Sequence, residues 1–94
     1  MDFEFEWDEA KNASNKNKHG VDFMDALRVF YDDMRITVYD DRSDYGEERF
    51  QVIGMSYGKI LFVVYTERHG NTIRIISARK AEKREAAAYT RGGF

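Results

Sequence analysis

The stretch Ile60–Tyr65 consists entirely of apolar or aromatic residues, so both faces of an extended segment here must be covered. Such a run, bounded by turn residues, is typical of a central strand in a sheet packed on both sides. Tyr57-Gly58 precedes it and His69-Gly70-Asn71 follows it, at distances that suit hairpins. We therefore expect strands over residues 48–55, 59–66 and 72–79, each pairing antiparallel with the next.

Two helices and a further strand are expected before this meander. Asp8 and Gly20 have the chemistry to start and stop a helix near residues 9–18, whose scarcity of large apolar side chains indicates slight packing or packing against another chain. Asp22 is suited to cap a second helix, and from Arg35 the pattern alternates as in a strand. The polar residues 40–46 then form a turn region. The second helix directs these side chains to the core: Phe23, Ala26, Leu27 and Phe30.

Both ends of the chain have recognisable patterns. Phe3, Phe5 and Trp7 alternate with acidic residues, which predicts a short, half-buried extended segment that contacts the core or a partner. Residues 80–89 are rich in strong helix formers, and Gly92-Gly93 ends that helix. The fold class is therefore α+β: a four-stranded antiparallel sheet preceded by two helices and followed by a C-terminal helix.

The length and composition limit the class of protein. With 94 residues the chain holds one domain, residues 1–94, and with no cysteine it needs no oxidising compartment. No apolar run approaches the roughly 20 residues of a membrane span, and the acidic, aromatic N-terminus does not resemble a signal peptide. We expect a soluble, cytoplasmic protein without membrane contact.

Charge is distributed unevenly along the chain. Residues 1–47 hold 13 acidic and 6 basic side chains, a net charge of −7, whereas residues 48–94 hold 4 acidic and 9 basic ones, a net charge of +5. The second half can therefore supply a basic patch that attracts phosphates, although the whole chain has a net charge of −2.

The charged and polar residues of the sequence favour a metal-independent reaction at a phosphate group. His19 and His69 are far apart, the glycines form no phosphate loop, and no nucleophile elbow is present, so we expect neither a metal nor another cofactor. Guanidinium groups bind phosphate oxygens in pairs and stabilise the extra negative charge of a phosphorane. Such a reaction also needs an acid and a base, for which Lys18, His19 and Glu48 are candidates. Four arginines lie on or near neighbouring strands: Arg49, Arg68, Arg74 and Arg79.

Each of these residues also has a structural alternative. Exposed strand arginines commonly pair with carboxylates, and Glu48 next to Arg49 can form a surface pair. His19 before Gly20 can bind a carbonyl at the end of a helix, and the cations of residues 80–84 can line a solvated helix face.

Several short stretches together resemble the BrnT toxins. They are Phe5-Glu6-Trp7-Asp8 with Lys11 and Asn15, Lys18-His19-Gly20-Val21, Asp41-Arg42, Gly46-Glu47-Glu48-Arg49, Val64-Tyr65-Thr66-Glu67-Arg68, and Arg74-Ile75-Ile76-Ser77-Ala78-Arg79-Lys80-Ala81 with Glu85 and Tyr89. Their shared order and spacing span nearly the whole chain, although it lacks the prolines that relatives often carry at the positions of Glu9 and Asp33.

The resemblance implies a RelE-like ribonuclease toxin of a bacterial type II toxin–antitoxin pair. It implies neutralisation by a BrnA antitoxin encoded beside the toxin, with operator DNA contacted only through that antitoxin. We expect an endoribonuclease of the mRNA interferase type, and the alternative is a non-catalytic protein- or RNA-binding module of the same fold. The catalytic candidates are His19, Glu48, Arg49, Arg68 and Arg79, and the RNA-binding candidates are Lys11, Lys18, Arg74, Lys80 and Tyr89.

Overall fold

The computed structural model describes residues 3–42 and 46–94. The elements follow in the order β1 (Glu4–Glu6), α1 (Glu9–His19), α2 (Phe23–Ala26), the 3-10 helix η1 (Leu27–Tyr31), β2 (Ile36–Asp40), β3 (Arg49–Ser56), β4 (Lys59–Arg68), β5 (Thr72–Lys80) and α3 (Lys83–Arg91). The expected α+β class is confirmed, as is the antiparallel pairing of β2 through β5 in sequence order. Residues 43–45 of the expected turn lie outside the described residues.

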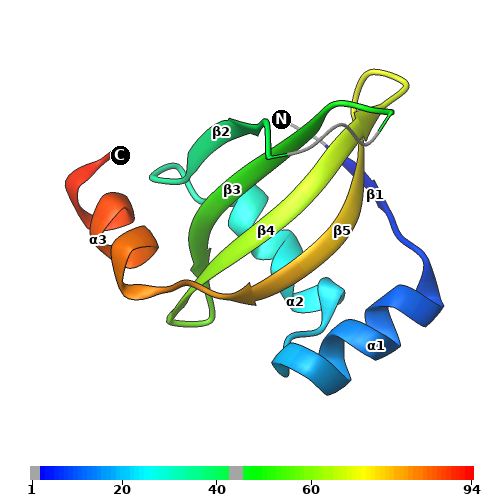
Figure 1. Cartoon of the computed structure of the whole chain (residues 1–94), viewed down its shortest axis with the longest axis horizontal. Helices are drawn as coiled ribbons and strands as arrows, with labels where there is room; N and C mark the ends of the chain where they lie inside the picture. The colour runs from blue at the N-terminus through cyan, green and yellow to red at the C-terminus, as the bar shows by residue number, and fades with distance from the viewer. Residues whose placement is uncertain (1–2, 43–45) are drawn as a thin grey trace.

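The sheet has five strands, so the expectation of four was wrong (Figure 1). Its order is β1-β5-β4-β3-β2, and the apolar strand β4 lies at its centre as expected. The additional strand is the N-terminal extended segment, which pairs parallel to β5 with Glu4 opposite Thr72 and Glu6 opposite Arg74. Alternation within β1 predicts an extended segment but does not indicate which strand it joins. The long connection through α1, α2 and the rest of the sheet allows the parallel pairing, which a tight turn would not.

One side of the sheet is covered by α2 and η1, and we call it the α2 face. Asp22 caps α2 by accepting the N–H of Met24, and the helix continues directly as η1, so the expected second helix forms in two parts. Gly54 in β3 allows the close approach of η1, because a Cβ there would lie 2.8 Å from Cγ1 of Val29. The buried core on this face consists of Phe23, Ala26, Val29, Phe30, Val52, Leu61, Val63, Tyr65, Ile73, Ile75 and Ala78.

The helix α1 is attached by polar contacts. Asp8 accepts the N–H of Lys11 at its start, and Gly20 closes its end with φ +73°. The side-chain amide of buried Asn15 donates to the carbonyls of Val21 and Ala78 at 2.9 and 2.8 Å, and its Oδ1 accepts the N–H of Ala78. Packing of α1 is thus intramolecular, with asparagines in place of the apolar stripe that amphipathic helices use.

The other side of the sheet carries Ile53, Phe62 and Val64, and we call it the α3 face. Tyr89 of α3 packs against this cluster, so the predicted cover on both faces of β4 is confirmed. The last helix begins at Lys83, because β5 continues to Lys80 and Glu82 acts as the N-cap in a capping box with Glu85. Among the described residues, no helix combines the length and apolar character needed to cross a membrane.

Candidate phosphate-binding site

The strand register places three arginines at one end of the α3 face. Arg74 lies opposite Thr66, and Arg68 follows Thr66 by two residues along β4. The side chains of Arg68 and Arg74 therefore lie on the same face as that of Thr66. Because Phe50 pairs with Tyr65, Arg49 also lies opposite Thr66 from the other side. We call Arg49, Arg68 and Arg74 the arginine cluster.

A β-bulge decides which arginines share this face. Arg74 and Arg79 are five positions apart, so in a regular strand they would point to opposite sides of the sheet. The register shifts between Val64 and Tyr65, which inserts one extra residue into β5. Arg79 consequently lies opposite Phe62, on the same face as Arg74.

A carboxylate stands between two members of the arginine cluster. Oε2 of Glu47 lies 3.4 Å from Nε of Arg49, and Oε1 of Glu47 lies 3.5 Å from Nη2 of Arg68. These distances are long for charge-assisted hydrogen bonds, which are usually about 2.7 to 2.9 Å. Two anionic oxygens between two guanidinium groups mark the position that two phosphate oxygens could take.

The neighbouring charges are held more tightly. Arg74 donates to Oε2 of Glu6 at 2.6 Å, across the pairing of β1 with β5. Asp40, whose side chain is fully buried, accepts two bonds from Arg42 at 2.8 and 2.7 Å. These bonds, which outweigh the effect of burial, lower the pKa of the Asp40 carboxyl. The arginine cluster is thus flanked by the Glu6–Arg74 pair and by the Asp40–Arg42 pair.

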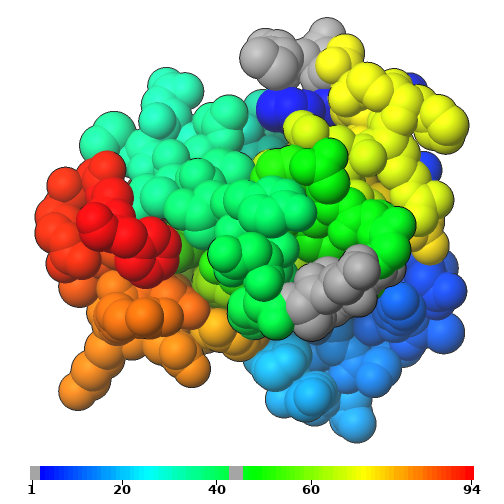
Figure 2. All heavy atoms as spheres, turned by 45° about the horizontal axis from the view of Figure 1, so that its top comes forward, coloured from blue at the N-terminus to red at the C-terminus, as the bar shows by residue number. Residues whose placement is uncertain are grey.

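A pocket of about 230 Å³ opens beside the arginine cluster. The hydroxyl of Thr66 donates to the carbonyl of Glu48 at 2.6 Å, which fixes the backbone where β3 begins. In Figure 2 the start of β3 and the β4–β5 turn form adjoining surface at one end, whereas α3 lies on the opposite side of the view. The pocket is lined by Glu47, Glu48, Phe50, Thr66, Glu67 and Arg68.

Arg79 lies apart from this cluster and pairs with a carboxylate of α3. Six residues separate Phe62 from Arg68 along β4, or roughly 20 Å at the usual strand rise. Arg79 donates two bonds of 2.9 Å to Glu85 of α3, and its guanidinium lies 4.2 Å from the centre of the Phe62 ring. The bonds that Arg79 donates to Glu85 raise the pKa of Arg79. Burial raises the pKa of Glu85, but the bonds from Arg79 and from the N–H of Glu82 outweigh it and leave that pKa lowered.

The remaining candidates are also separate from the arginine cluster. Lys11, Lys18 and His19 belong to α1. Asn15 binds this helix to Ala78 of β5, and Ala78 pairs with Val63, which is five residues from Arg68 along β4. Lys80 ends β5 near α3, and Tyr89 donates to Asp32 at 2.6 Å. The structure therefore groups Glu48 with Arg49, Arg68 and Arg74. It does not bring His19, Arg79, Lys11, Lys18, Lys80 or Tyr89 to that place.

The residue that sequence reasoning missed at this site is Glu47. Its adjacency to Glu48 and Arg49 was visible, but its contact with Arg68 depends on the pairing of β3 with β4. Within residues 3–42 and 46–94, no three histidine, aspartate or glutamate side chains gather in an arrangement that could hold a metal ion.

Comparisons with known proteins identify the family and the fold of the chain. No curated protein matches the chain. Among solved structures it is similar to the ribonuclease toxin BrnT of Brucella abortus, with 27% sequence identity and a TM-score of 0.69, over 87% of this chain and 100% of that one. The model of the family described as the ribonuclease toxin BrnT of type II toxin–antitoxin systems matches residues 7–85. Because that match covers most of the chain, which also shares its fold with a BrnT structure, the protein belongs to the BrnT family of ribonuclease toxins.

Proposed function

We propose that this protein is a metal-independent endoribonuclease of the mRNA interferase type. A BrnA-type antitoxin binds it in the cytoplasm, and operator DNA is contacted only through that antitoxin. Family membership supports the ribonuclease class and the antitoxin partner. The position of Glu47 between Arg49 and Arg68 is the observation that carries the site assignment.

In the proposed reaction the scissile phosphate replaces the Glu47 carboxylate between Arg49 and Arg68. The 2′-oxygen of the RNA attacks the adjacent phosphorus and forms a 2′,3′-cyclic phosphate. The bond from phosphorus to the 5′-oxygen breaks, and the departing oxygen takes a proton from water to become the new 5′-hydroxyl. The arginines stabilise the extra negative charge on the phosphate oxygens, while Arg74 adds positive potential beside them. Glu48, which lines the same pocket, accepts the 2′-hydroxyl proton. Its position favours it over His19, which lies on α1.

Induction of the protein without an antitoxin tests the ribonuclease activity. We expect growth arrest in cells and, with purified protein in the presence of a chelator, RNA fragments with new 5′-hydroxyl ends. The Arg68→Ala variant is expected to cleave about 100-fold more slowly, because a phosphate-binding cation is lost. The matched control is Arg91→Ala, which removes an exposed arginine at the end of α3. Equal cleavage by Arg68→Ala and the wild-type protein would contradict the site assignment.

The second candidate function is a non-catalytic protein- or RNA-binding module. It is favoured by the carboxylate partners of the arginines, since Glu6 and Glu47 neutralise part of the cluster. The two functions differ in a single measurement: RNA that binds tightly and is recovered without new 5′-hydroxyl ends identifies the binding module. Formation of an antitoxin complex is expected in both cases and does not separate them.

A further inference from the structure

Exposed apolar side chains gather at a part of the surface that the proposed nuclease site does not use. Among the described residues, the large hydrophobic side chains that remain exposed include Tyr31 at 55%, Met55 at 36% and Tyr57 at 69%. Met24 and Met34, also exposed, lie on α2 and in the loop after η1. Such clusters are uncommon on the surfaces of free monomers and mark interaction sites.

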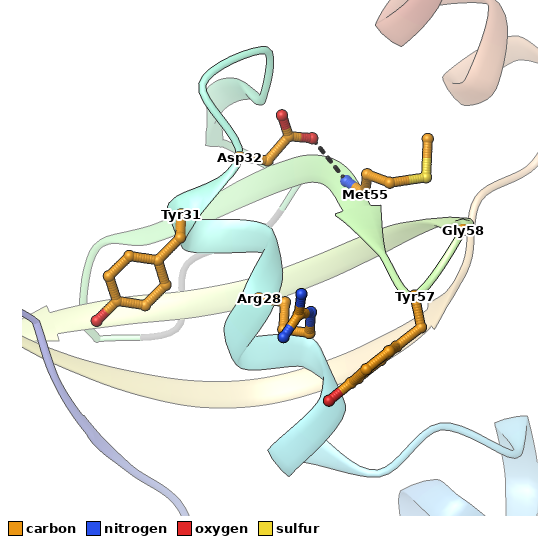
Figure 3. A pocket seen from close by; sticks show the side chains of 6 residues that line it. All are labelled: Arg28, Tyr31, Asp32, Met55, Tyr57 and Gly58. Atoms are coloured by element: carbon orange, nitrogen blue, oxygen red, sulfur yellow. Dashed lines mark hydrogen bonds between the residues drawn. The ribbon is translucent and has the colours of Figure 1, made fainter.

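Three of these side chains line a groove between η1 and the β3–β4 turn. The groove has a volume of about 490 Å³ and is lined by Arg28, Tyr31, Asp32, Met55, Tyr57 and Gly58. Figure 3 shows Arg28 from η1 beside Tyr57 from the turn, with Tyr31 and Asp32 further along the same segment. We call these six residues the η1 groove.

The η1 groove is held in shape by specific contacts. The guanidinium of Arg28 lies 4.4 Å from the centre of the Tyr57 ring, and Tyr57 has the left-handed backbone conformation of a tight turn, with φ +48°. Asp32 accepts the N–H groups of Met34 and Met55 at 2.9 and 2.8 Å, and the hydroxyl of Tyr89 at 2.6 Å. A preformed groove loses little conformational entropy on binding.

The groove is remote from the arginine cluster. Met55 lies six residues beyond Arg49 along β3, or roughly 20 Å at the usual strand rise. An occupant of the groove is therefore distinct from the phosphate that we place between Arg49 and Arg68.

The charges of the groove argue against RNA and for a protein. Burial raises the pKa of Asp32, but bonds from Tyr89, Met55 and Met34 outweigh it, so the pKa is lowered and the carboxylate is ionised at neutral pH. Asp33 follows it directly, and the cation Arg28 is stacked on Tyr57. Phosphates are repelled by such carboxylates, whereas a carboxylate oxygen bonded to one N–H can accept a second donor from a basic side chain.

We propose that the η1 groove binds a segment of the antitoxin that carries a large apolar side chain next to a lysine or arginine. The apolar side chain fills the space between Tyr31, Met55 and Tyr57, and the basic one pairs with Asp32. This inference rests on the proposed function in one respect: it takes the antitoxin partner from there and adds the place where it binds.

The test measures binding of the full-length chain to the purified protein encoded by the adjacent gene. Tyr57→Asn removes the exposed ring and keeps a residue that tolerates positive φ. Met55→Lys replaces an apolar lining side chain with a cation that competes for Asp32 and repels the partner's basic side chain, without altering the turn. We expect each variant to bind about 30-fold more weakly, as for the loss of a central anchor, with RNA cleavage unchanged. The matched control is Tyr39→Thr, which replaces another exposed tyrosine, on β2, with a good strand former and should bind normally.

The three possible outcomes of this experiment lead to different conclusions. Normal binding by both groove variants, with their fold verified by circular dichroism, would overturn the groove assignment and leave the proposed function intact. Weakened RNA binding with unchanged antitoxin binding would assign the groove to RNA and overturn the inference. If the wild-type chain does not bind the adjacent gene product, the proposed partner and the inference both fail.

Discussion

At the scale of single residues, the contacts of Glu47 differ from those of the other acidic residues near the site. The ion pairs of Glu47 with Arg49 and Arg68 have N···O distances of 3.4 and 3.5 Å, whereas Glu6 lies 2.6 Å from Arg74 and Glu85 lies 2.9 Å from Arg79. Long contacts between partly exposed charges are weak, typically below about 1 kcal/mol. A phosphate can therefore displace Glu47 more easily than it can displace Glu6 or Glu85.

Removal of the Glu47 charge should strengthen RNA binding. We expect Glu47→Gln to bind a short single-stranded RNA about 2- to 5-fold more tightly than the wild-type protein, because the phosphate no longer competes with a carboxylate. Fluorescence anisotropy at fixed salt measures the change. Glu67→Gln removes the same charge from the same pocket and should produce a smaller gain. Weaker binding by Glu47→Gln would show that this carboxylate supports the site.

Substitution of Arg79 should act mainly on stability. Glu85 is 3% exposed and receives two bonds from Arg79, so Arg79→Ala leaves a buried carboxylate without them. We expect the free energy of unfolding in urea to fall by about 3 kcal/mol. The double variant Arg79→Ala/Glu85→Ala should recover part of this loss, because the unpaired charge is gone. A loss of RNA cleavage with unchanged stability would instead support a direct role in catalysis.

At the scale of elements, α1 shows how a helix with little apolar surface can be fixed to a sheet. Asn12 donates to Asp22 and accepts the N–H of Phe23, while Asn15 bridges Val21 and Ala78. These bonds satisfy backbone groups at the start of α2 and in β5 that would otherwise be buried without a hydrogen-bond partner. Asn12 and Asn15, which have the polarity of solvent-exposed residues, therefore determine where α1 lies on the fold.

This attachment can be tested with two asparagines of the same helix. Asn15→Ala removes all three side-chain bonds to Val21 and Ala78 and should lower the free energy of unfolding by about 2 kcal/mol. Asn17→Ala changes an exposed position of α1 and should be neutral or slightly stabilising, because alanine is the better helix former. Chemical denaturation of both variants measures the difference. Equal effects would mean that the Asn15 bonds contribute little.

At the scale of the whole molecule, four carboxylates in different parts of the chain make the fold sensitive to acid. The pKa values of four carboxyl groups are lowered in the folded protein, so folding is favoured by their ionisation: Asp22, Asp32, Asp40 and Glu85. Their contribution is present above the ordinary values of 3.8 for aspartate and 4.5 for glutamate, and it is lost as the pH falls below them. Tyr89 behaves in the opposite sense, since its bond to Asp32 raises its pKa to about 12.

Thermal unfolding across the pH range should show both effects. We expect the Tm to decrease below about pH 4.5 as the four carboxylates protonate, and to decrease again between about pH 10 and 12 as Tyr89 ionises. In the Tyr89→Phe variant the alkaline decrease should be smaller, because the titrating hydroxyl is absent. An unchanged alkaline decrease in that variant would show that the Asp32–Tyr89 bond has no influence on stability there.

Much of the architecture follows from local patterns. The apolar run of β4, the turns on either side of it, and the caps Asp8, Asp22 and Gly20 predict elements close to those observed. Other features depend on contacts distant in sequence. The pairing of β1 with β5 and the attachment of α1 through Asn15 have no periodic signal, since a three-residue strand and a polar helix each look exposed when taken alone.

By itself, the sequence determined the order of strands and helices, the central place of β4 and the resemblance to BrnT toxins, because hydrophobic periodicity, turn residues and short motifs are local properties. Only the tertiary structure decided which charged groups meet. The β5 bulge turns Arg74 and Arg79 to the same face, the strand register places Arg49 and Arg68 on either side of Glu47, and Glu85 engages Arg79. The reason is that a side chain's partners across a sheet depend on register, which one extra residue changes.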